Sequence, residues 1–382
     1  MKKGKIMRDK GILKIFMMIP ACFLLSFCMQ TCVQAKSTEA VQTAEAVRDV
    51  PAGEDQKITL GFAGDINLDE NWATTKYMDR QKNGIKDCFS ADLIQQMQQF
   101  DLFMLNNEFT YSRRGTPLNG KAYTFRADPS RVTDLSILGT DIVLLANNHV
   151  YDYGREAMLD TFDTLTAAGI PFVGAGKDLK EASAPVYFTS NGYRIAYVAA
   201  SRAEKYKMTP QATESEPGIL RCYDMTVFLN EIREAASQAD YVVASVHWGT
   251  EYDHHASKLQ RKMAQQMIDA GADAVIGTHP HVLQGMEYYK KKPIIYSLGN
   301  FWFNDKNLYT GMLELTLDVQ EKTGGPQLIK VRFIPCTQYD LVTKQAESSS
   351  LKQKILNSEQ KISFGIKIDK DGTVLDSDAS DK

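Results

Sequence analysis

Histidine, carboxylate and amide side chains gather at five points of the sequence, each directly after a short apolar run. The five clusters are Gly64-Asp65 with Asn67, Asn106-Asn107-Glu108, Asn147-Asn148-His149, His247-Trp248-Gly249 and Thr278-His279-Pro280-His281. Such ligands suit borderline divalent ions such as Mn²⁺, Fe²⁺ or Zn²⁺. A carboxylate that bridges two ions would form a two-metal site, which activates water and binds phosphoryl oxygens. Four of the six histidines lie in these clusters, so the sequence predicts a divalent-metal site.

The apolar runs before these clusters are typical of strands in a largely parallel sheet. Runs rich in β-forming residues cover 58–63, 102–105, 142–146, 241–246 and 274–277. Helical periodicity appears at 91–100, 129–138, 155–168, 225–239 and 257–270. Alternation of strands and helices predicts βαβ units, which bind ligands at the carboxyl ends of their strands. We therefore expect the five clusters to meet at one edge of the sheet.

Two antiparallel signals predict that the sheet is mixed or doubled. Asn191-Gly192 lies within residues 186–201, and Asn-Gly is the strongest short hairpin signal. Residues 313–319 and 328–334 form a second expected strand pair. The fold class is therefore α/β with mixed sheets. The polar, serine-rich stretch 342–360 belongs to an expected C-terminal extension, 341–382, in which a closing strand over 362–368 is expected.

The first 35 residues are typical of a targeting segment, because six basic residues precede or flank an uncharged stretch from 15 to 35. This segment is either a signal peptide cleaved near Ala35 or an uncleaved membrane anchor, and lipidation at Cys28 is a third alternative. Each predicts an exported protein, secreted or held at the membrane facing outward. Residues 36–56 lack periodicity and are expected to form a flexible linker. The main domain is expected over 57–340.

Composition excludes several classes of protein. The 382 residues are 43% hydrophobic and 24% charged, which predicts a folded core. Removing the first 35 residues from the totals of 44 basic and 47 acidic leaves 38 and 46, about −8 in charge, which argues against nucleic-acid binding. Neither a Gly-x-Ser-x-Gly elbow nor a P-loop occurs. The scattered Cys88, Cys222 and Cys336 are typical of buried thiols, not of a disulfide framework.

In their order along the chain, these motifs resemble those of the CapA family, which is associated with bacterial poly-γ-glutamate capsule synthesis. The matching motifs lie between Lys57 and Cys336: Gly64-Asp65, Asn107-Glu108, Ala146-Asn147-Asn148-His149, His247-Trp248-Gly249-x-Glu251-Tyr252, Gly277-x-His279-Pro280-His281-Val282 and Tyr296-Ser297-Leu298-Gly299-Asn300-Phe301. That family is similar to calcineurin-like metallophosphoesterases. The resemblance therefore implies a four-layer α/β sandwich of the metallophosphoesterase type, with two divalent metal ions at the strand ends.

The resemblance also implies roles for individual residues. The metal ligands would be Asp65, Glu108, Asn148, His247, His279 and His281. His149 would stand beside the scissile group as general acid. The residues that contact the substrate or support the ligands would be Asn67, Asn107, Trp248 and Asn300. Two departures matter: Asp65-Ile66-Asn67 replaces the Asp-x-His of the superfamily, and Glu108 stands where an Asp is usual.

Two functions of different classes follow. The first is a metal-dependent hydrolase or polymer-processing enzyme that acts outside the membrane on an anionic polymer such as poly-γ-glutamate. The second is a noncatalytic polymer-binding or scaffold subunit, working with membrane capsule-synthesis subunits and holding the polymer through cations; the altered first motif and the expected membrane tether favour it. Lys290, Lys291 and Lys292 form either a basic patch for the polymer or a solvated charge run.

Overall fold

The computed structural model describes residues 49–50, 56–204, 208–320 and 325–377. The expected targeting segment, 1–35, and most of the expected linker, 36–56, lie outside the described residues. The chain divides into two units, Met1–Ala40 and Val41–Lys382, and the second unit holds every element named below. Within the described residues, the helices are all too short or too polar to cross a membrane.

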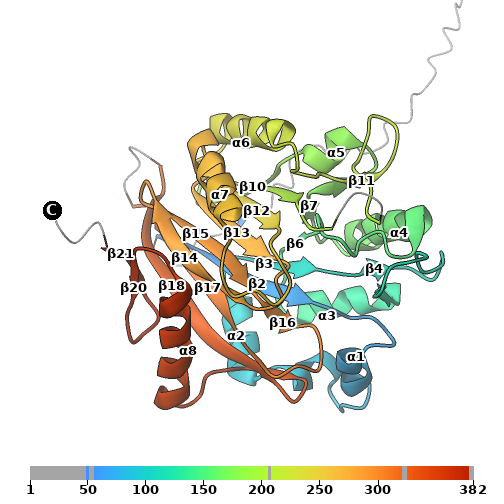
Figure 1. Ribbon diagram of the computed structural model, residues 1–382, viewed down its shortest axis with the longest axis horizontal. Helices are drawn as coiled ribbons and strands as arrows, with labels where there is room; N and C mark the ends of the chain where they lie inside the picture. Colours follow the sequence, from blue (N-terminus) through green and yellow to red (C-terminus); the bar gives the residue numbers. More distant parts are fainter. Residues whose placement is uncertain (1–48, 51–55, 205–207, 321–324, 378–382) are drawn as a thin grey trace, which may run out of the picture. The chain divides into compact units, whose positions relative to one another are not determined.

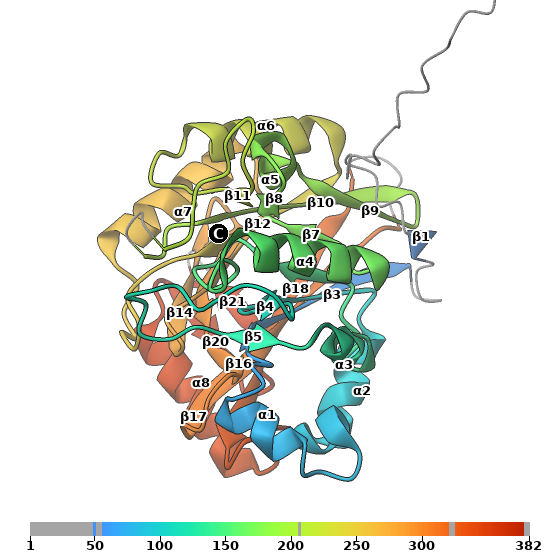
Figure 2. The same cartoon turned by 90° about the vertical axis from the view of Figure 1, so that its right-hand side faces the viewer.

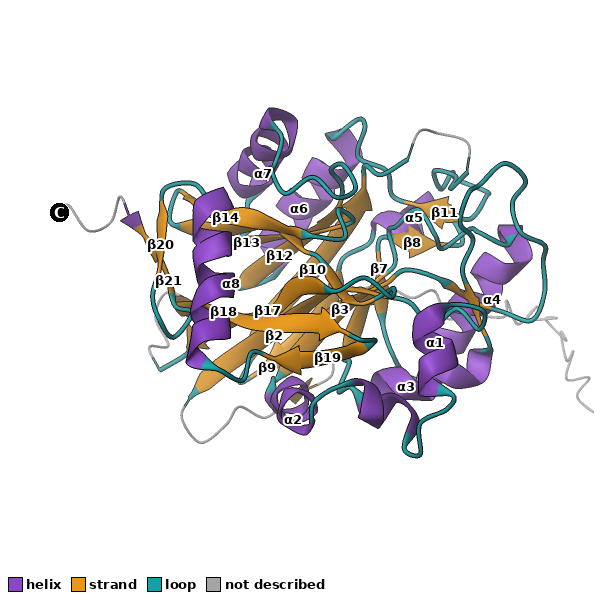
Figure 3. Ribbon diagram, turned by 60° about the horizontal axis from the view of Figure 1, so that its bottom comes forward, coloured by secondary structure: helices purple, strands orange, loops and turns teal. Residues whose placement is uncertain are grey.

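Two mixed β-sheets form the centre of the fold (Figure 3). The first sheet has the order β1 (Asp49–Val50), β9 (Val186–Ser190), β10 (Tyr193–Ser201), β12 (Tyr241–His247), β13 (Ala274–Thr278), β15 (Lys292–Leu298) and β14 (Leu283–Tyr289). The second has the order β19 (Val342–Gln345), β18 (Gln327–Tyr339), β17 (Leu308–Asp318), β2 (Lys57–Ile66), β3 (Leu102–Asn107), β6 (Ile142–Leu144) and β7 (Phe172–Val173), with β16 (Asn300–Trp302) paired to β2. The central strands of each sheet, β10-β12-β13-β15 and β2-β3-β6-β7, run parallel.

Helices cover the outer faces of both sheets, which gives four layers (Figures 1 and 2). Side chains of α6 (Thr226–Gln238) and α7 (Lys258–Ala270) pack on the first sheet. Those of α2 (Ala91–Gln99), α3 (Val132–Ile137) and α4 (Gly154–Ala167) pack on the second. The expected four-layer α/β sandwich with mixed sheets is therefore confirmed.

The shorter elements lie in the connections. They are α1 (Ala73–Met78), α5 (Leu179–Ser183), the 3₁₀ turns Gly84–Cys88 and Pro129–Arg131, and three two-stranded pairs, β4 (Thr110–Tyr111) with β5 (Arg126–Ala127), β8 (Ala175–Gly176) with β11 (Gly218–Ile219), and β20 (Ile366–Ile368) with β21 (Val374–Asp376).

Alternating side chains explain why the strands are apolar throughout. In β3, Leu102 and Met104 enter the core between the two sheets, whereas Phe103 and Leu105 enter the core under the helices. Successive side chains of a strand point to opposite faces, and both faces of these sheets are covered. The apolar runs that precede the polar clusters are therefore two-sided core strands.

Most expected elements occur within a few residues of their predicted bounds. The hairpin is confirmed, since β9 and β10 pair antiparallel across Asn191 and Gly192, whose φ angles are 54° and 79°. The pair β17 and β18 is antiparallel too. Cys88, Cys222 and Cys336 are free and buried, as expected.

The C-terminal segment differs from the polar extension expected over 341–382. It supplies β19 and the helix α8 (Ser349–Ile362), and strand β20 begins at Ile366, after the helix. Ile355 and Leu356 of α8 join the core between the sheets. The exposed face of α8 carries the Ser, Gln and Lys residues that make its sequence polar. Because only a narrow stripe of the helix is apolar, the composition of the segment did not indicate a core helix.

Candidate metal centre

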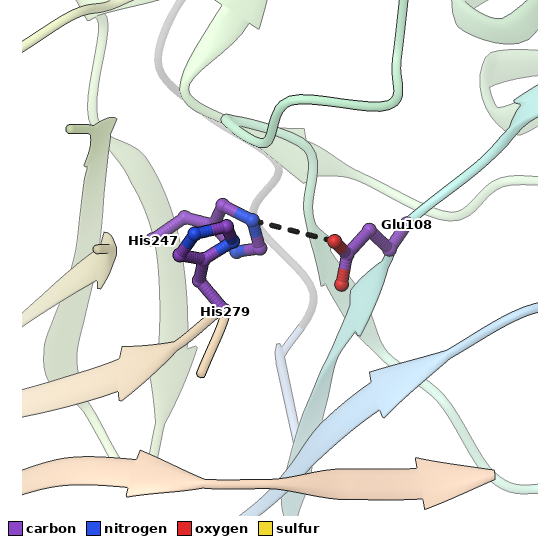
Figure 4. Close-up of side chains that lie close together, drawn as sticks. All are labelled: Glu108, His247 and His279. Carbon is purple, nitrogen blue, oxygen red and sulfur yellow. Dashed lines mark ion pairs between the residues drawn. The ribbon is translucent and has the colours of Figure 1, made fainter. Parts of the chain in front are cut away.

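Carboxylate and imidazole side chains meet where β2, β3, β12 and β13 end. Glu108 lies with His247 and His279 in one group whose ligand atoms are within 4.8 Å of one another (Figure 4). Asp65, Glu108 and His281 form a second such group. Because Glu108 belongs to both groups, it stands where a bridging ligand of two metal ions would stand. We call these five residues the metal cluster.

The atoms of the metal cluster fit a divalent cation. Oε1 of Glu108 is 3.5 Å from Nε2 of His247 and 3.8 Å from Nε2 of His281. This Oε1 atom and Nδ1 of His279 are buried and accept or donate no hydrogen bond among the residues that the structure describes. Leaving buried polar atoms without a partner is unfavourable. A cation bound between them would supply the missing partner.

Two of the imidazoles are oriented by hydrogen bonds on the nitrogen that faces away from Glu108. Nδ1 of His247 lies 2.9 Å from the hydroxyl of Thr278, and Nδ1 of His281 lies 2.8 Å from Oδ1 of Asn300. Metal-binding histidines commonly use one ring nitrogen in this way, which leaves the other as the ligand atom. Asn148 joins the cluster as well, with its Oδ1 2.7 Å from Nε2 of His247.

Charges in the metal cluster are strongly perturbed by burial. Burial and the nearby Asp65 raise the pKa of Glu108 well above its usual value. Burial also raises the pKa of Asp65, but the interactions with His281, His247 and Asn106 together outweigh it and lower that pKa overall. Burial lowers the pKa of His247 to about 3 and that of His279 well below normal. Both imidazoles are therefore neutral, the form that binds metals.

The backbone of the loop after β13 is strained. His279 and His281 have φ angles of 99° and 59°, although residues with a side chain rarely adopt positive φ. Such conformations cost about 1–3 kcal/mol each and occur mainly at functional sites. Here they bring both imidazoles of the His-Pro-His loop into one cluster.

Close contact between β2 and the chain before β16 positions Asp65. A Cβ atom on Gly64 would lie 1.8 Å from the carbonyl oxygen of Gly299. The amide of Asp65 donates to that same oxygen at 2.9 Å. Only glycine fits at position 64, and this fit places Asp65 beside His281, with Oδ2 3.1 Å from Nδ1.

His149 lies at the edge of the metal cluster in a pair with Asp152. Its Nδ1 is 2.6 Å from Oδ2 of Asp152, and its Nε2 is 3.9 Å from Oε1 of Glu108. Burial lowers the pKa of His149 well below normal and raises that of Asp152 to about 7. Lys121 holds the other Asp152 oxygen at 2.7 Å. The ring therefore points Nε2 toward the space where a substrate would react.

Three residues expected to contact substrate or support ligands lie outside the metal cluster. Oδ1 of Asn67 accepts from the amide of Asp69 in a turn, at 2.8 Å. Asn107 donates to the carbonyl of Phe109 at 3.0 Å. Trp248 is fully buried and donates to the carbonyl of Tyr296, so it belongs to the core. Of the four expected residues, only Asn300 contacts a ligand.

Three polar residues at this site were given no role in the sequence analysis. Nδ2 of Asn106 donates to Oδ1 of Asp65 at 2.7 Å and to Oε2 of Glu108 at 3.0 Å. The two-residue period of a strand places Asn106 on the same face as Glu108, and this signal could have identified it. Glu251 forms a third ligand group with His279 and His281, and it lies within the His247-Trp248-Gly249-x-Glu251-Tyr252 motif. Lys121 lies in a loop, where no sequence pattern marks it.

An open cavity of about 360 Å³ lies against the metal cluster, and we call it the metal-side cavity. His149 and His281 contribute to its wall. Its other lining side chains are largely aromatic, with several polar or charged ones: Trp72, Tyr123, Phe125, Glu251, Tyr252, Phe303, Asn304, Asp305 and Lys306. The Nζ atom of Lys306 lies 3.5 Å from the centre of the Tyr252 ring. An elongated anionic substrate could therefore meet both an aromatic wall and a cation here.

Lys290, Lys291 and Lys292 are remote from this cavity. Lys290 and Lys291 form the turn between β14 and β15, and Lys292 begins β15, at the opposite end of β14 from His281. Lys290 pairs with Asp269 at 2.6 Å, and Lys292 pairs with Asp273. This arrangement fits the charge-run alternative and not a basic patch at the metal site.

Comparisons with known proteins agree with the motif pattern. A model of the bacterial capsule synthesis protein PGA_cap matches residues 59–305. The chain is 33% identical over 278 residues to the capsule biosynthesis protein CapA of Bacillus anthracis, a match over 69% of this chain and 64% of that protein. It is 29% identical over 388 residues to the PGA biosynthesis protein CapA of Bacillus subtilis strain 168, covering 100% of this chain and 96% of that one.

Among solved structures, a hypothetical protein from Thermus thermophilus matches 73% of this chain and 98% of its own, with 16% identity and a TM-score of 0.42. The family model covers well over half of the chain and includes every residue of the metal cluster. The chain therefore belongs to the bacterial capsule synthesis protein family PGA_cap, the family of the CapA proteins.

Proposed function

We propose that this protein acts outside the cytoplasmic membrane in poly-γ-glutamate capsule synthesis, as a metal-dependent hydrolase that processes the anionic polymer. The names of the relatives support the pathway, because two of them are called capsule or PGA biosynthesis proteins. The position of Glu108 carries the proposal for metal chemistry, since this residue is shared by two ligand groups beside His149. The charged and apolar segments of residues 1–35 support export.

The metal cluster and Asn148 would hold two divalent ions, Mn²⁺, Fe²⁺ or Zn²⁺. When bound, such ions supply an activated water molecule and polarise the bond to be cut. Asn106 keeps the carboxylates of Asp65 and Glu108 in place through its two hydrogen bonds. The hydroxyl of Thr278 and the amide of Asn300 do the same for the imidazoles.

His149 is suited to transfer the proton at the leaving atom. Asp152 fixes the ring through Nδ1, and Lys121 fixes Asp152. Because the lowered pKa leaves the ring one proton, held on Nδ1, Nε2 faces the metal cluster unprotonated. It can take a proton from the attacking water and pass it to the leaving nitrogen of a γ-glutamyl amide or to the leaving oxygen of a phosphoester. Lys306 would pair with a carboxylate of the polymer, and bound metal ions would offset the charges of Glu251 and Asp305 in the same lining, which matters because the chain after residue 35 is acidic overall.

The test combines metal analysis and an activity assay on the full chain. Metal content is measured by plasma mass spectrometry, and the length of poly-γ-glutamate is followed by size-exclusion chromatography, with a generic phosphodiester assayed in parallel. We expect about two equivalents of metal and shortening of the polymer that is lost in His149→Ala. A protein that binds no metal after reconstitution with Mn²⁺, Fe²⁺ and Zn²⁺ would overturn the proposal.

A second function, a noncatalytic polymer-binding subunit, is favoured by Asn67. The superfamily motif places a histidine there, whereas the Asn67 side chain accepts a hydrogen bond from Asp69 and lies outside every ligand group among the described residues. One metal ion would therefore have fewer protein ligands. Bound metal and retention of the polymer, without turnover of polymer or phosphoester, would establish this alternative.

A further inference from the structure

A second cavity, of about 530 Å³, lies beside the metal-side cavity. Three chain segments contribute neighbouring residues to the two cavities. In each segment, one residue lines the metal-side cavity and a residue two or three positions later lines the second cavity. These pairs are Tyr252 and His254, His281 and Leu283, and Lys306 and Tyr309. Helix α8 supplies Ser358, Glu359, Lys361 and Ile362 to the second cavity. We call it the α8 cavity.

Glu359 is the unusual residue of the α8 cavity. Its side chain is fully buried, on the same face of α8 as Ile355 and Leu356, which belong to the core between the sheets. Neither carboxylate oxygen has a hydrogen-bond partner in the described part of the chain. The spacing of this stripe calls for an apolar residue at 359, and an unpartnered buried carboxylate destabilises a fold. A ligand that partners the carboxylate would account for its presence.

The other polar groups of the α8 cavity define what this ligand carries. Lys361, an exposed cation on the same helix, lines the same cavity, so the cavity offers a carboxyl group and a cation. Nδ1 of His254 lies 3.0 Å from the carbonyl oxygen of Leu283, so Nδ1 donates and Nε2 can accept. Val282, Leu283, Leu308 and Ile362 supply apolar walls. A group with an ammonium and a carboxylate on a short carbon skeleton fits this pattern.

We propose that the α8 cavity binds an α-amino acid group, with its ammonium at Glu359 and its carboxylate at Lys361. Two molecules present this group: free glutamate, and the amino end of a γ-linked glutamate chain, whose first residue keeps both its α-ammonium and its α-carboxylate. The second source rests on the proposed function in poly-γ-glutamate synthesis, whereas the first does not. In either case the ligand sits next to the metal-side cavity, separated from it by the three shared segments.

Protonation of Glu359 gives the proposal an independent readout. Burial raises the pKa of Glu359 well above its usual value, so the empty site holds a proton at neutral pH. An ammonium bound to the carboxylate would displace that proton. The other titratable side chains that line the cavity are His254, His255, Tyr309, Tyr339 and Lys361.

The experiment is isothermal titration calorimetry on the full chain at pH 7. The probes are L-glutamate, D-glutamate, glutarate, which lacks the amine, and γ-linked triglutamate with a free or an acetylated amino end. We expect a glutamate enantiomer or the free triglutamate to bind at least about tenfold more tightly than glutarate or acetylated triglutamate. The heat should also depend on the buffer's ionisation enthalpy, because a proton is released. Tighter binding of triglutamate identifies the chain end, and equal or tighter binding of glutamate identifies the free amino acid.

Variants separate this proposal from the function of the metal cluster. Glu359→Gln keeps the size of the side chain, and we expect it to weaken binding at least about tenfold while metal content and the thermal unfolding temperature stay the same or rise. His279→Ala should lose metal and retain glutamate binding. The proposal is overturned if no probe binds at about 10 mM, if glutarate binds as well as glutamate, or if folded Glu359→Gln binds as tightly as the original chain.

Discussion

The metal cluster and the α8 cavity both bury a glutamate, but they surround it differently. Glu108 is within 4 Å of three imidazoles and accepts a hydrogen bond from Asn106. Glu359 lies on an apolar helix stripe, and in the described residues its oxygens have no partner. The first carboxylate is one ligand among many, whereas the second is the sole acidic group among the described residues that line its cavity. The surroundings of Glu108 therefore suit a metal ion, and those of Glu359 suit the ammonium group that we propose.

The backbone is strained at the metal cluster and regular at the α8 cavity. Strained φ angles at His279 and His281 and the tight contact at Gly64 hold the metal cluster in one geometry. At the α8 cavity, Glu359 and Lys361 belong to a regular helix with no such strain. Metal ions demand exact ligand positions, while an ammonium group accepts a range of hydrogen-bond directions. The difference in backbone strain is the one that the two proposed ligands would require.

The largest effect should come from removing the carboxylate that both metal groups share. Glu108→Gln should reduce metal content from about two equivalents to nearly none, because a coordinating oxyanion is replaced by a neutral amide. Plasma mass spectrometry of the purified full chain measures this. Asp269→Asn, an exposed carboxylate that pairs with Lys290, is the control and should keep its metal. Full metal content in Glu108→Gln would contradict the bridging position.

The next largest effect concerns proton transfer beside the metal cluster. His149→Ala should lower the rate of polymer or phosphoester cleavage by about 10²–10⁴-fold, the usual contribution of a general acid or base. Metal content should remain near that of the original chain, because His149 belongs to none of the ligand groups found among the described residues. A variant that loses metal together with activity would show that His149 is a ligand and not the proton donor.

The same two regions show which site residues could be predicted from the sequence and which could not. The clusters at Asp65, Glu108, His247 and His279 were found because parallel strands in one sheet end at a common edge. That rule places residues in space without knowledge of packing. It placed Asn106 in a strand-end cluster but assigned it no role, although the period of a strand puts its side chain beside Glu108. Trp248 shows the opposite failure, since its proximity to His247 in sequence placed it near the site while its ring packs in the core.

The α8 cavity could not be predicted from the sequence. Helix α8 lies in a polar, serine-rich stretch, and its buried face is only a narrow stripe around Ile355 and Leu356. A glutamate at position 359 is unremarkable in such a composition. Its burial depends on contacts with strands more than fifty residues away in the sequence, such as β14. Tertiary packing, which local patterns do not encode, creates this site.

A change at Glu359 should have the opposite sign to most core substitutions. Glu359→Leu should raise the free energy of unfolding at pH 7 by about 1–3 kcal/mol, because it removes an unpartnered buried carboxyl group and completes an apolar stripe. Urea unfolding of the full chain without ligand measures this. In contrast, Glu108→Leu should destabilise the metal-bound protein, since bound metal stabilises the folded state. A destabilised Glu359→Leu protein would show that the carboxyl group has a stabilising partner.

The smallest effect is expected at a third buried carboxyl group, which lies outside both the metal cluster and the α8 cavity. Burial raises the pKa of Asp134 in α3 to about 6, so the folded protein keeps this proton while the unfolded chain releases it near pH 3.8. The folded state is therefore penalised as the pH rises from about 4 to 6, and the penalty stays constant above that range. The full pKa difference corresponds to about 3 kcal/mol, and after a discount for solvent screening we expect Asp134→Asn to gain about 1 kcal/mol at pH 7 relative to pH 4. Urea unfolding at both pH values measures the difference. If Asp134→Asn changes the free energy of unfolding equally at pH 4 and pH 7, Asp134 ionises normally in the folded protein. Burial alone would then not keep a carboxyl group of this chain protonated, and the argument that Glu359 needs a bound cation to ionise would be weakened.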